Sequence, residues 1–122
     1  MTWTGLHLVR AAGRVFLEAA PRGIDPDQLG ERIASVDGIA ELHDLHVWQI
    51  GPRTAAVSAH LLVEPSHDCH EVSSRVRAVL NEAYGIGHVT LQTDHADATT
   101  HGSDDCADSH GSVHSTRLTG EG

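Results

Sequence analysis

The chain has 122 residues, which fits one domain, and about 75 of them remain to bury a small core once weakly structured ends are set aside. Its formal net charge of −9 argues against nucleic-acid binding, which needs a basic surface, and suits a divalent cation. A core of this size is marginal alone, so we expect a homodimer. Eleven histidines supply ligands suited to late transition metals.

Targeting and redox features point to a cytoplasmic location. No signal peptide is expected, and no segment reaches the roughly 20 apolar residues that a membrane span requires. The two cysteines, Cys69 and Cys106, lie in very different sequence settings, so a disulfide is not expected.

The chain begins with an amphipathic pattern between residues 3 and 20. Apolar and small residues recur at spacings of three and four, which predicts a helix: Leu6, Val9, Gly13, Phe16, Leu17 and Ala20. Two interpretations stay open, a surface helix packed on the domain and a membrane-proximal helix cut from something larger.

A second helix and a strand follow. Asp25 is the predicted N-cap, Pro26 the first helical residue, and residues 37–38 the end of this helix. The strand over residues 39–50 is apolar on both parities, with Ile39, Leu45 and Val47 on one face and Leu42, Trp48 and Ile50 on the other. Such a pattern predicts burial on both faces.

A turn at residues 51–53 leads into a strand over 54–64, a helix and a third strand over 87–94. The second strand should turn Leu61 to the core and His60 to the opposite face. Ser66 or Asp68 can cap the helix, which ends at residues 84–85, and Asp68 with Glu71 matches a capping box. The third strand should bury Val89 and Leu91 and turn these residues to the other face: His88, Thr90, Gln92 and Asp94.

The predicted fold class is α+β, a ferredoxin-like α-β-β-α-β domain over residues 23–94 that is preceded by a linker helix within residues 1–22. Its hairpin is antiparallel, and a right-handed crossover should lay the third strand parallel to the second or one strand removed. The result is a three-stranded mixed sheet with two helices on one face. Residues 95–122 lack periodicity and are predicted to be a disordered tail that binds metal loosely, if at all, through His95, His101, Cys106, His110 and His114.

Four side chains are candidate zinc ligands in this fold: His43, His60, His70 and Asp94. They come from three strands and the first turn of a helix, and zinc needs three or four converging N, S or O donors. Structural histidines with satisfied hydrogen bonds are the alternative. No catalytic residues are predicted, since no Ser or Cys nucleophile pairs with a His and no Gly-rich phosphate loop occurs.

Four segments resemble the cytoplasmic C-terminal domain of the cation diffusion facilitator family of zinc transporters: residues 17–25, 36–48 (with His-Asp-Leu-His-Val-Trp), 58–61 and 84–92. The resemblance implies a domain that follows the transmembrane domain of a cation efflux transporter, dimerises in the cytoplasm and binds zinc. Zinc would tighten the dimer and favour export by proton-coupled exchange. The dimer is expected to form near Trp48 and the open sheet face.

The resemblance also assigns ligands. His43 matches the first His of the family's His-Asp-Leu motif, His60 the strand-two histidine, His70 a helix histidine of some members and Asp94 the acidic ligand after the third strand. Gln92 stands where some members have a further His, which argues against a full two-metal cluster. The metal is expected to be Zn²⁺, with Co²⁺, Cd²⁺ and Ni²⁺ as alternatives.

No membrane domain is expected in this chain, since residues 3–20 look like the end of the last membrane helix and its linker. The chain is then either a fragment of an exporter or a stand-alone soluble metal-binding protein that buffers or delivers metal.

Overall fold

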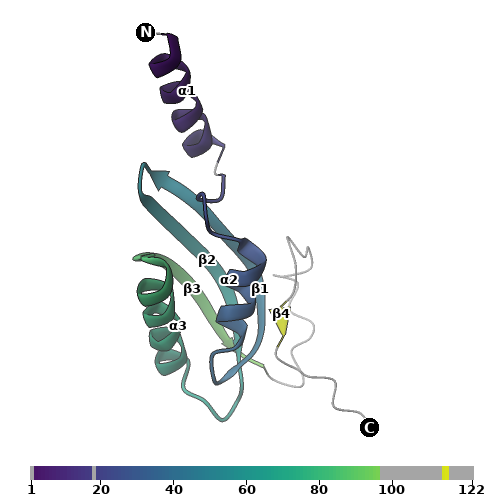
Figure 1. The fold of residues 1–122 in the computed structure, drawn as a ribbon. Coiled ribbons are helices and arrows are strands. Elements are labelled where there is room, and N and C mark those ends of the chain that lie inside the picture. The colour runs from purple at the N-terminus through teal and green to yellow at the C-terminus, as the bar shows by residue number, and fades with distance from the viewer. Residues whose placement is uncertain (1, 18, 97–113, 116–122) are drawn as a thin grey trace.

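The computed structural model describes residues 2–17, 19–96 and 114–115. In chain order the elements are α1 (Thr2–Phe16), α2 (Pro26–Ala34), β1 (Ile39–Gly51), β2 (Thr54–Val63), α3 (Cys69–Tyr84), β3 (His88–His95) and β4 (His114–Ser115). Figure 1 shows α2 and α3 side by side against the sheet, and α1 projecting from the end of the domain beyond the β1–β2 turn.

The sheet has the strand order β3-β2-β1-β4. β1 and β2 are antiparallel and β3 lies parallel to β2, so the predicted mixed sheet of these three strands is confirmed, and β4 adds a fourth strand beside β1. Leu29 and Ile33 of α2, Val76 of α3 and Leu61 of β2 belong to one buried cluster. Both helices therefore cover the same face of the sheet, and among the described residues no helix covers the other face.

The helix starts follow the predicted caps. The Asp25 carboxylate accepts a hydrogen bond from the Asp27 N–H at 3.0 Å, and the Asp68 carboxylate accepts one from the Glu71 N–H at 2.9 Å. The Glu71 carboxylate pairs with Arg75 at 2.9 Å. The capping-box prediction assigned the Glu71 carboxylate to the N-terminus of α3, whereas in the structure this carboxylate forms an (i, i+4) ion pair with Arg75.

β1 departs from the predicted alternation because it contains register shifts. Its pairing with β2 shifts between Ile39 and Glu41, between His43 and His46, and between Gln49 and Gly51. Each shift is a β-bulge, which inserts one extra residue and reverses the parity of the side chains that follow. Asp44, in the second bulge, has φ +49°, a left-handed conformation that Asp tolerates better than most residues.

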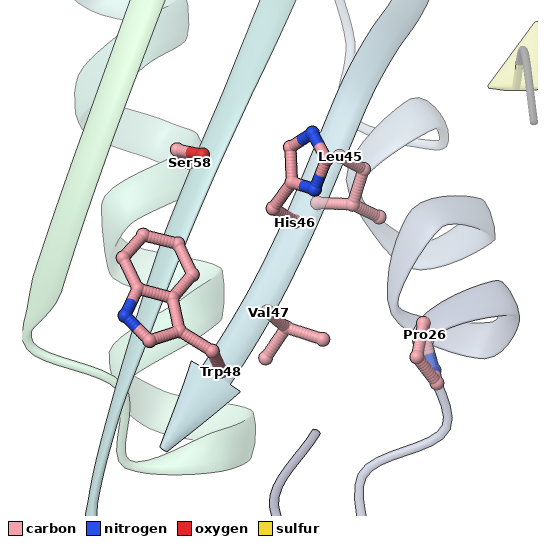
Figure 2. Close-up of a pocket in the computed structure, with 6 residues that line it drawn as sticks. All are labelled: Pro26, Leu45, His46, Val47, Trp48 and Ser58. Carbon is pink, nitrogen blue, oxygen red and sulfur yellow. The ribbon is translucent and has the colours of Figure 1, made fainter. Parts of the chain in front are cut away.

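The bulges correct the prediction that β1 is buried on both faces. Ile39, Leu42 and Val47 are all buried in the core although their parities differ, whereas Ile50 is exposed. Figure 2 shows Leu45 and Val47 on the side of β1 toward α2, and Trp48 on the side toward Ser58 of β2. These residues, with Pro26 and His46, line a cavity of about 470 Å³.

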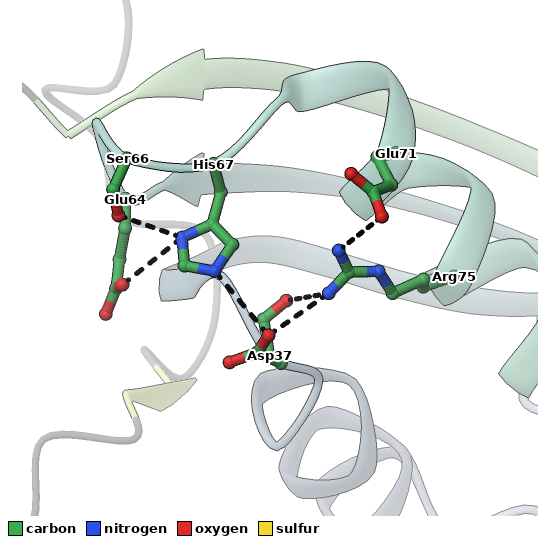
Figure 3. Close-up of polar contacts among 6 residues, drawn as sticks. All are labelled: Asp37, Glu64, Ser66, His67, Glu71 and Arg75. Atoms are coloured by element: carbon green, nitrogen blue, oxygen red, sulfur yellow. Dashed lines mark hydrogen bonds and ion pairs between the residues drawn. The ribbon is translucent and has the colours of Figure 1, made fainter.

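Polar contacts join the end of α2 to the start of α3 (Figure 3). The His67 ring lies between two carboxylates, with Nε2 3.5 Å from Asp37 and Nδ1 3.5 Å from Glu64. Arg75 donates to the Asp37 carbonyl at 3.1 Å and pairs with its carboxylate at 3.3 Å. Gly38 lies beneath this group with φ +93°, a conformation that favours glycine.

Replacing Gly38 with Ala is expected to lower the free energy of unfolding by about 1–3 kcal/mol, the cost of backbone strain in such a region. An added Cβ would lie 2.8 Å from the His67 ring and 2.8 Å from Val72 Cγ2, so the contacts of Figure 3 must also shift. Urea unfolding measures the effect. Gly87→Ala is the matched control, because its Cβ would meet nothing within 4 Å; equal losses in the two variants would contradict this prediction.

α1 and the linker behave differently from a packed surface helix. Leu6 and Val9, on the face predicted to be apolar, are exposed. The Gln49 N–H of β1 donates to the Ala19 carbonyl at 3.2 Å, which ties the linker to the domain. Arg14 Nη2 of α1 donates to the Ala20 carbonyl at 2.6 Å, which joins the helix to the linker. Among the described residues, no helix is both long and apolar enough to cross a membrane.

The C-terminal boundary also differs from the prediction. His95 ends β3 rather than beginning the tail, and the Ala96 N–H donates to the Val63 carbonyl at 2.8 Å. Residues 114–115 form β4, which pairs antiparallel with β1 at Glu41 and Leu42. The rest of the predicted tail, residues 97–113 and 116–122, lies outside the described residues.

Candidate metal centre

The face of the sheet that no helix covers carries the predicted strand ligands. In the register of the sheet, His43 of β1 lies opposite His60 of β2, which lies beside Gln92 of β3. One row further along, Glu41 lies opposite Leu62, which lies beside Asp94. Residues in register project to the same side of a sheet, so the two rows bring imidazoles and carboxylates together.

His60 and Asp94 are in direct contact. His60 Nε2 lies 2.8 Å from Asp94 Oδ2, and Gln92 Nε2 donates to the same oxygen at 3.2 Å. The His60 side chain is 13% exposed and that of Asp94 57%, so the imidazole is sheltered while the carboxylate still reaches solvent. The hydrogen bonds from Gln92 and, next, from His60 lower the pKa of Asp94 below its ordinary value.

His43 makes a second imidazole–carboxylate pair beside the first. Its Nε2 lies 3.0 Å from Glu41 Oε2, and its ring centroid lies 6.1 Å from that of His60, with the ring planes tilted by 51°. Glu41 was not predicted from the sequence. Glu41 and His43 are two residues apart with no register shift between them, so alternation along the strand places both on one face. The bulge between Ile39 and Glu41 turns that face away from the core that Ile39 occupies.

His70 stands apart from the other three predicted ligands. It is exposed on the first turn of α3, a helix that packs on the opposite face of the sheet from His60. Within the part of the chain that the structure describes, no group of three or more His, Cys, Asp or Glu side chains is arranged to hold a metal ion. In a single chain, His60 contacts Asp94 and His43 contacts Glu41, each at hydrogen-bond distance.

Replacing Gln92 with Ala is expected to raise the pKa of Asp94 toward its usual value, because Gln92 supplies the largest stabilisation of the ionised carboxylate. A lowered folded-state pKa contributes stability above the unfolded pKa, and this contribution is lost as the pH falls through the lowered pKa. The variant should therefore lose the contribution at a higher pH. Carbon-13 NMR titration of the carboxyl carbons measures the shift.

Thr90→Ala is the matched control for the Gln92 variant. Thr90 lies on the same face of β3, two residues away, and pairs in register with Ser58. The Asp94 pKa should be unchanged in this control, and an unchanged pKa in Gln92→Ala would contradict the assignment of cause.

Comparison with known proteins assigns the chain to a family. Residues 21–96 match the family described as cation efflux protein, cytoplasmic domain. The chain belongs to this family. The resemblance noted from the sequence is therefore confirmed, and the match ends at the residue that follows β3.

The curated relatives of this cation efflux domain include metal transporters. The chain is 33% identical over 92 residues to the vacuolar zinc transporter TgZnT of Toxoplasma gondii. This match covers 75% of this chain and 10% of the relative. The chain is also 33% identical over 95 residues to the cadmium, cobalt and zinc/H⁺-K⁺ antiporter of Bacillus velezensis, covering 76% and 30%. The chain thus spans less than a third of the length of each.

Solved structures agree with the fold. The metal-bound C-terminal domain of the CzcD transporter from Cupriavidus metallidurans superposes with a TM-score of 0.55 at 25% identity, covering 58% of this chain and 99% of that one. A nickel form of the MamM C-terminal domain superposes with a TM-score of 0.51 at 16% identity, covering 58% and 94%, and shows the shared fold. The predicted α+β fold class is confirmed.

Proposed function

We propose that this cation efflux domain is the zinc-binding regulatory and dimerisation module of a divalent-cation exporter, at its cytoplasmic face. Zinc would be held on the open sheet face by His43, His60 and Asp94, and His70 would come from a second copy of the chain. Cobalt, cadmium and nickel could occupy the same donors, since imidazole and carboxylate sites accept several divalent ions. The domain acts by binding and assembly and has no catalytic role of its own.

The observation that carries this proposal is the pair of His60 and Asp94 with His43 beside it. All three lie on the sheet face that α2 and α3 leave uncovered. Trp48 lies on the same face in register with Ala56, so an apolar surface adjoins the polar donors. A net charge of −9 further favours a cation.

Zinc binding would have to open the hydrogen bond between His60 and Asp94. Tetrahedral zinc with N and O ligands at about 2.0–2.1 Å separates its donors by about 3.4 Å. The present 2.8 Å is a hydrogen-bond distance, so the two side chains must part by a few tenths of an ångström. Such a site binds zinc fully only when further ligands arrive, which couples metal binding to assembly of two copies.

His70 is the ligand whose position requires the partner. It lies on the far side of its own sheet from His60, so a single chain does not bring the two together. A dimer that sets the start of α3 of one protomer beside the open face of the other would bring His70 to these donors. Zinc would then bridge protomers and fix their separation.

Sedimentation velocity of the full chain, in zinc and in chelator, tests this function. We expect zinc to tighten the dimer by ~5–150-fold, the range for a coupling free energy of ~1–3 kcal/mol. Equal dimer dissociation constants in zinc and chelator would leave only passive dimerisation. A chain that binds zinc yet stays monomeric would support the alternative, a stand-alone soluble metal-buffering protein.

A further inference from the structure

A second pair of metal-binding side chains lies where the start of α3 meets the end of β3. Cys69 is the first residue of α3 and His95 the last of β3. Cys69 Sγ lies 3.5 Å from His95 Nε2 and 3.9 Å from Nδ1. The parallel pairing of β3 with β2 sets His95 beside Val63, just before the chain turns into α3, which explains the contact.

This pair is separate from the candidate metal centre. Side chains alternate across a strand, so His95 projects to the opposite side from Asp94. Val63, the register partner of His95, is fully buried in the core under the helices. The thiol and the His95 imidazole therefore lie on the helix-covered side of the sheet, and His60 and Asp94 on the open side.

The His95 ring is already oriented by the backbone. Its Nε2 lies 3.1 Å from the His67 carbonyl oxygen and donates to it. In that tautomer Nδ1 keeps a lone pair for a metal ion. Histidine ligands in metal sites almost always donate their other N–H to a carboxylate, carbonyl or water in this way.

We propose that Cys69 and His95 form a second cation site, which binds a thiophilic divalent ion such as Cd²⁺ or Zn²⁺ through Sγ and Nδ1. A tetrahedral zinc with Zn–S of about 2.3 Å and Zn–N of about 2.0–2.1 Å separates these donors by about 3.6 Å. The observed 3.9 Å needs only a small closure. Thiolate and imidazole are the donors that soft ions prefer, and water fills the remaining positions.

Binding exchanges one proton for the metal. The Cys69 thiol releases its proton to the buffer as the sulfur–metal bond forms, since the thiolate is the ligand. Cys69 is only partly buried, so the ion and water can reach the sulfur. The site would take cations independently of whether two copies of the chain associate through their open sheet faces.

A cadmium titration of the full chain carrying Cys106→Ser, in which Cys69 is the remaining thiol, tests the proposal. Two signals are followed: thiolate-to-cadmium charge-transfer absorption in the ultraviolet and the rate of Cys69 alkylation by iodoacetamide. We expect the absorption to appear with one equivalent of bound cadmium and alkylation to slow at least ~10-fold, because the bound thiolate is no longer a free nucleophile. Adding Cys69→Ser should remove the absorption.

His95 is tested by two variants in the same background. His95→Ala removes the ring, and His95→Gln keeps a donor for the His67 carbonyl but lacks imidazole. Both should weaken cadmium binding, read from the charge-transfer midpoint, by at least ~100-fold, since the loss of a direct ligand exceeds that of an outer-shell partner. His88→Ala, which removes an exposed imidazole in register with Ala56, should leave the midpoint unchanged. An unchanged midpoint in both His95 variants, or alkylation that cadmium does not slow, would overturn the proposal.

Discussion

Replacing His60 with Ala is expected to abolish the zinc-dependent tightening of the dimer and to weaken zinc binding on the open face by at least ~100-fold. Outer-shell partners of a metal are worth ~10–100-fold in affinity, and the loss of a direct ligand should exceed that. The fold should remain, since His60 lies on the uncovered face and contacts Asp94 rather than the core. Sedimentation velocity with and without zinc, together with circular dichroism, measures both effects.

His88→Ala is the matched control for the His60 variant. It removes an exposed imidazole from the same sheet face, in register with Ala56 rather than with the metal-binding rows. Its zinc response should equal that of the wild type. If the dimer of His60→Ala tightens in zinc as the wild type does, the ligand assignment is wrong even where the domain still binds metal.

Replacing Leu61 with Ala is expected to lower the free energy of unfolding by ~2–5 kcal/mol, the usual cost of truncating a buried leucine. Leu61 is 0% exposed on β2, which lies between β1 and β3 and faces both helices. The free energy of unfolding of a domain is typically ~5–15 kcal/mol, so this loss would leave a large part of the molecules unfolded at moderate urea concentrations. Urea unfolding in chelator measures it.

Leu62→Ala tests whether the loss belongs to the core. Leu62 is the next residue on β2, faces the open side between Glu41 and Asp94, and is only partly buried. In a dilute, metal-free sample, Leu62→Ala should lower the free energy of unfolding by well under half as much as Leu61→Ala does. Equal costs for the two leucines would contradict a core on one side of the sheet only.

Local features of the fold were predictable from the sequence. Asp25 and Asp68 cap their helices as expected because an N-cap depends on one side chain and the backbone a few residues away. The clean alternation of β2 also held, with Leu61 in the core and His60 on the open face. The parallel pairing of β3 with β2 was one of the placements expected for two strands that a helix connects.

The faces of β1 were not predictable in the same way. Apolar residues at both odd and even positions suggested burial on two sides, whereas the first two bulges turn Ile39, Leu42 and Val47 to one side. A bulge depends on the partner strand and its register, which periodicity within one strand does not report. The left-handed conformation of Asp44 marks the second bulge in the structure.

The candidate metal ligands, too, were only partly predictable from the sequence. The sequence alone determined which donor types the chain offers, and the period-two pattern determined that His60 and Asp94 share a face. Only the tertiary structure decided which donors meet: His60 with Asp94, His43 with Glu41, and Cys69 with His95, while His70 stays apart. Contacts such as that between Cys69 and His95 join residues distant in the chain, so strand register and helix packing set them, and no local spacing encodes them.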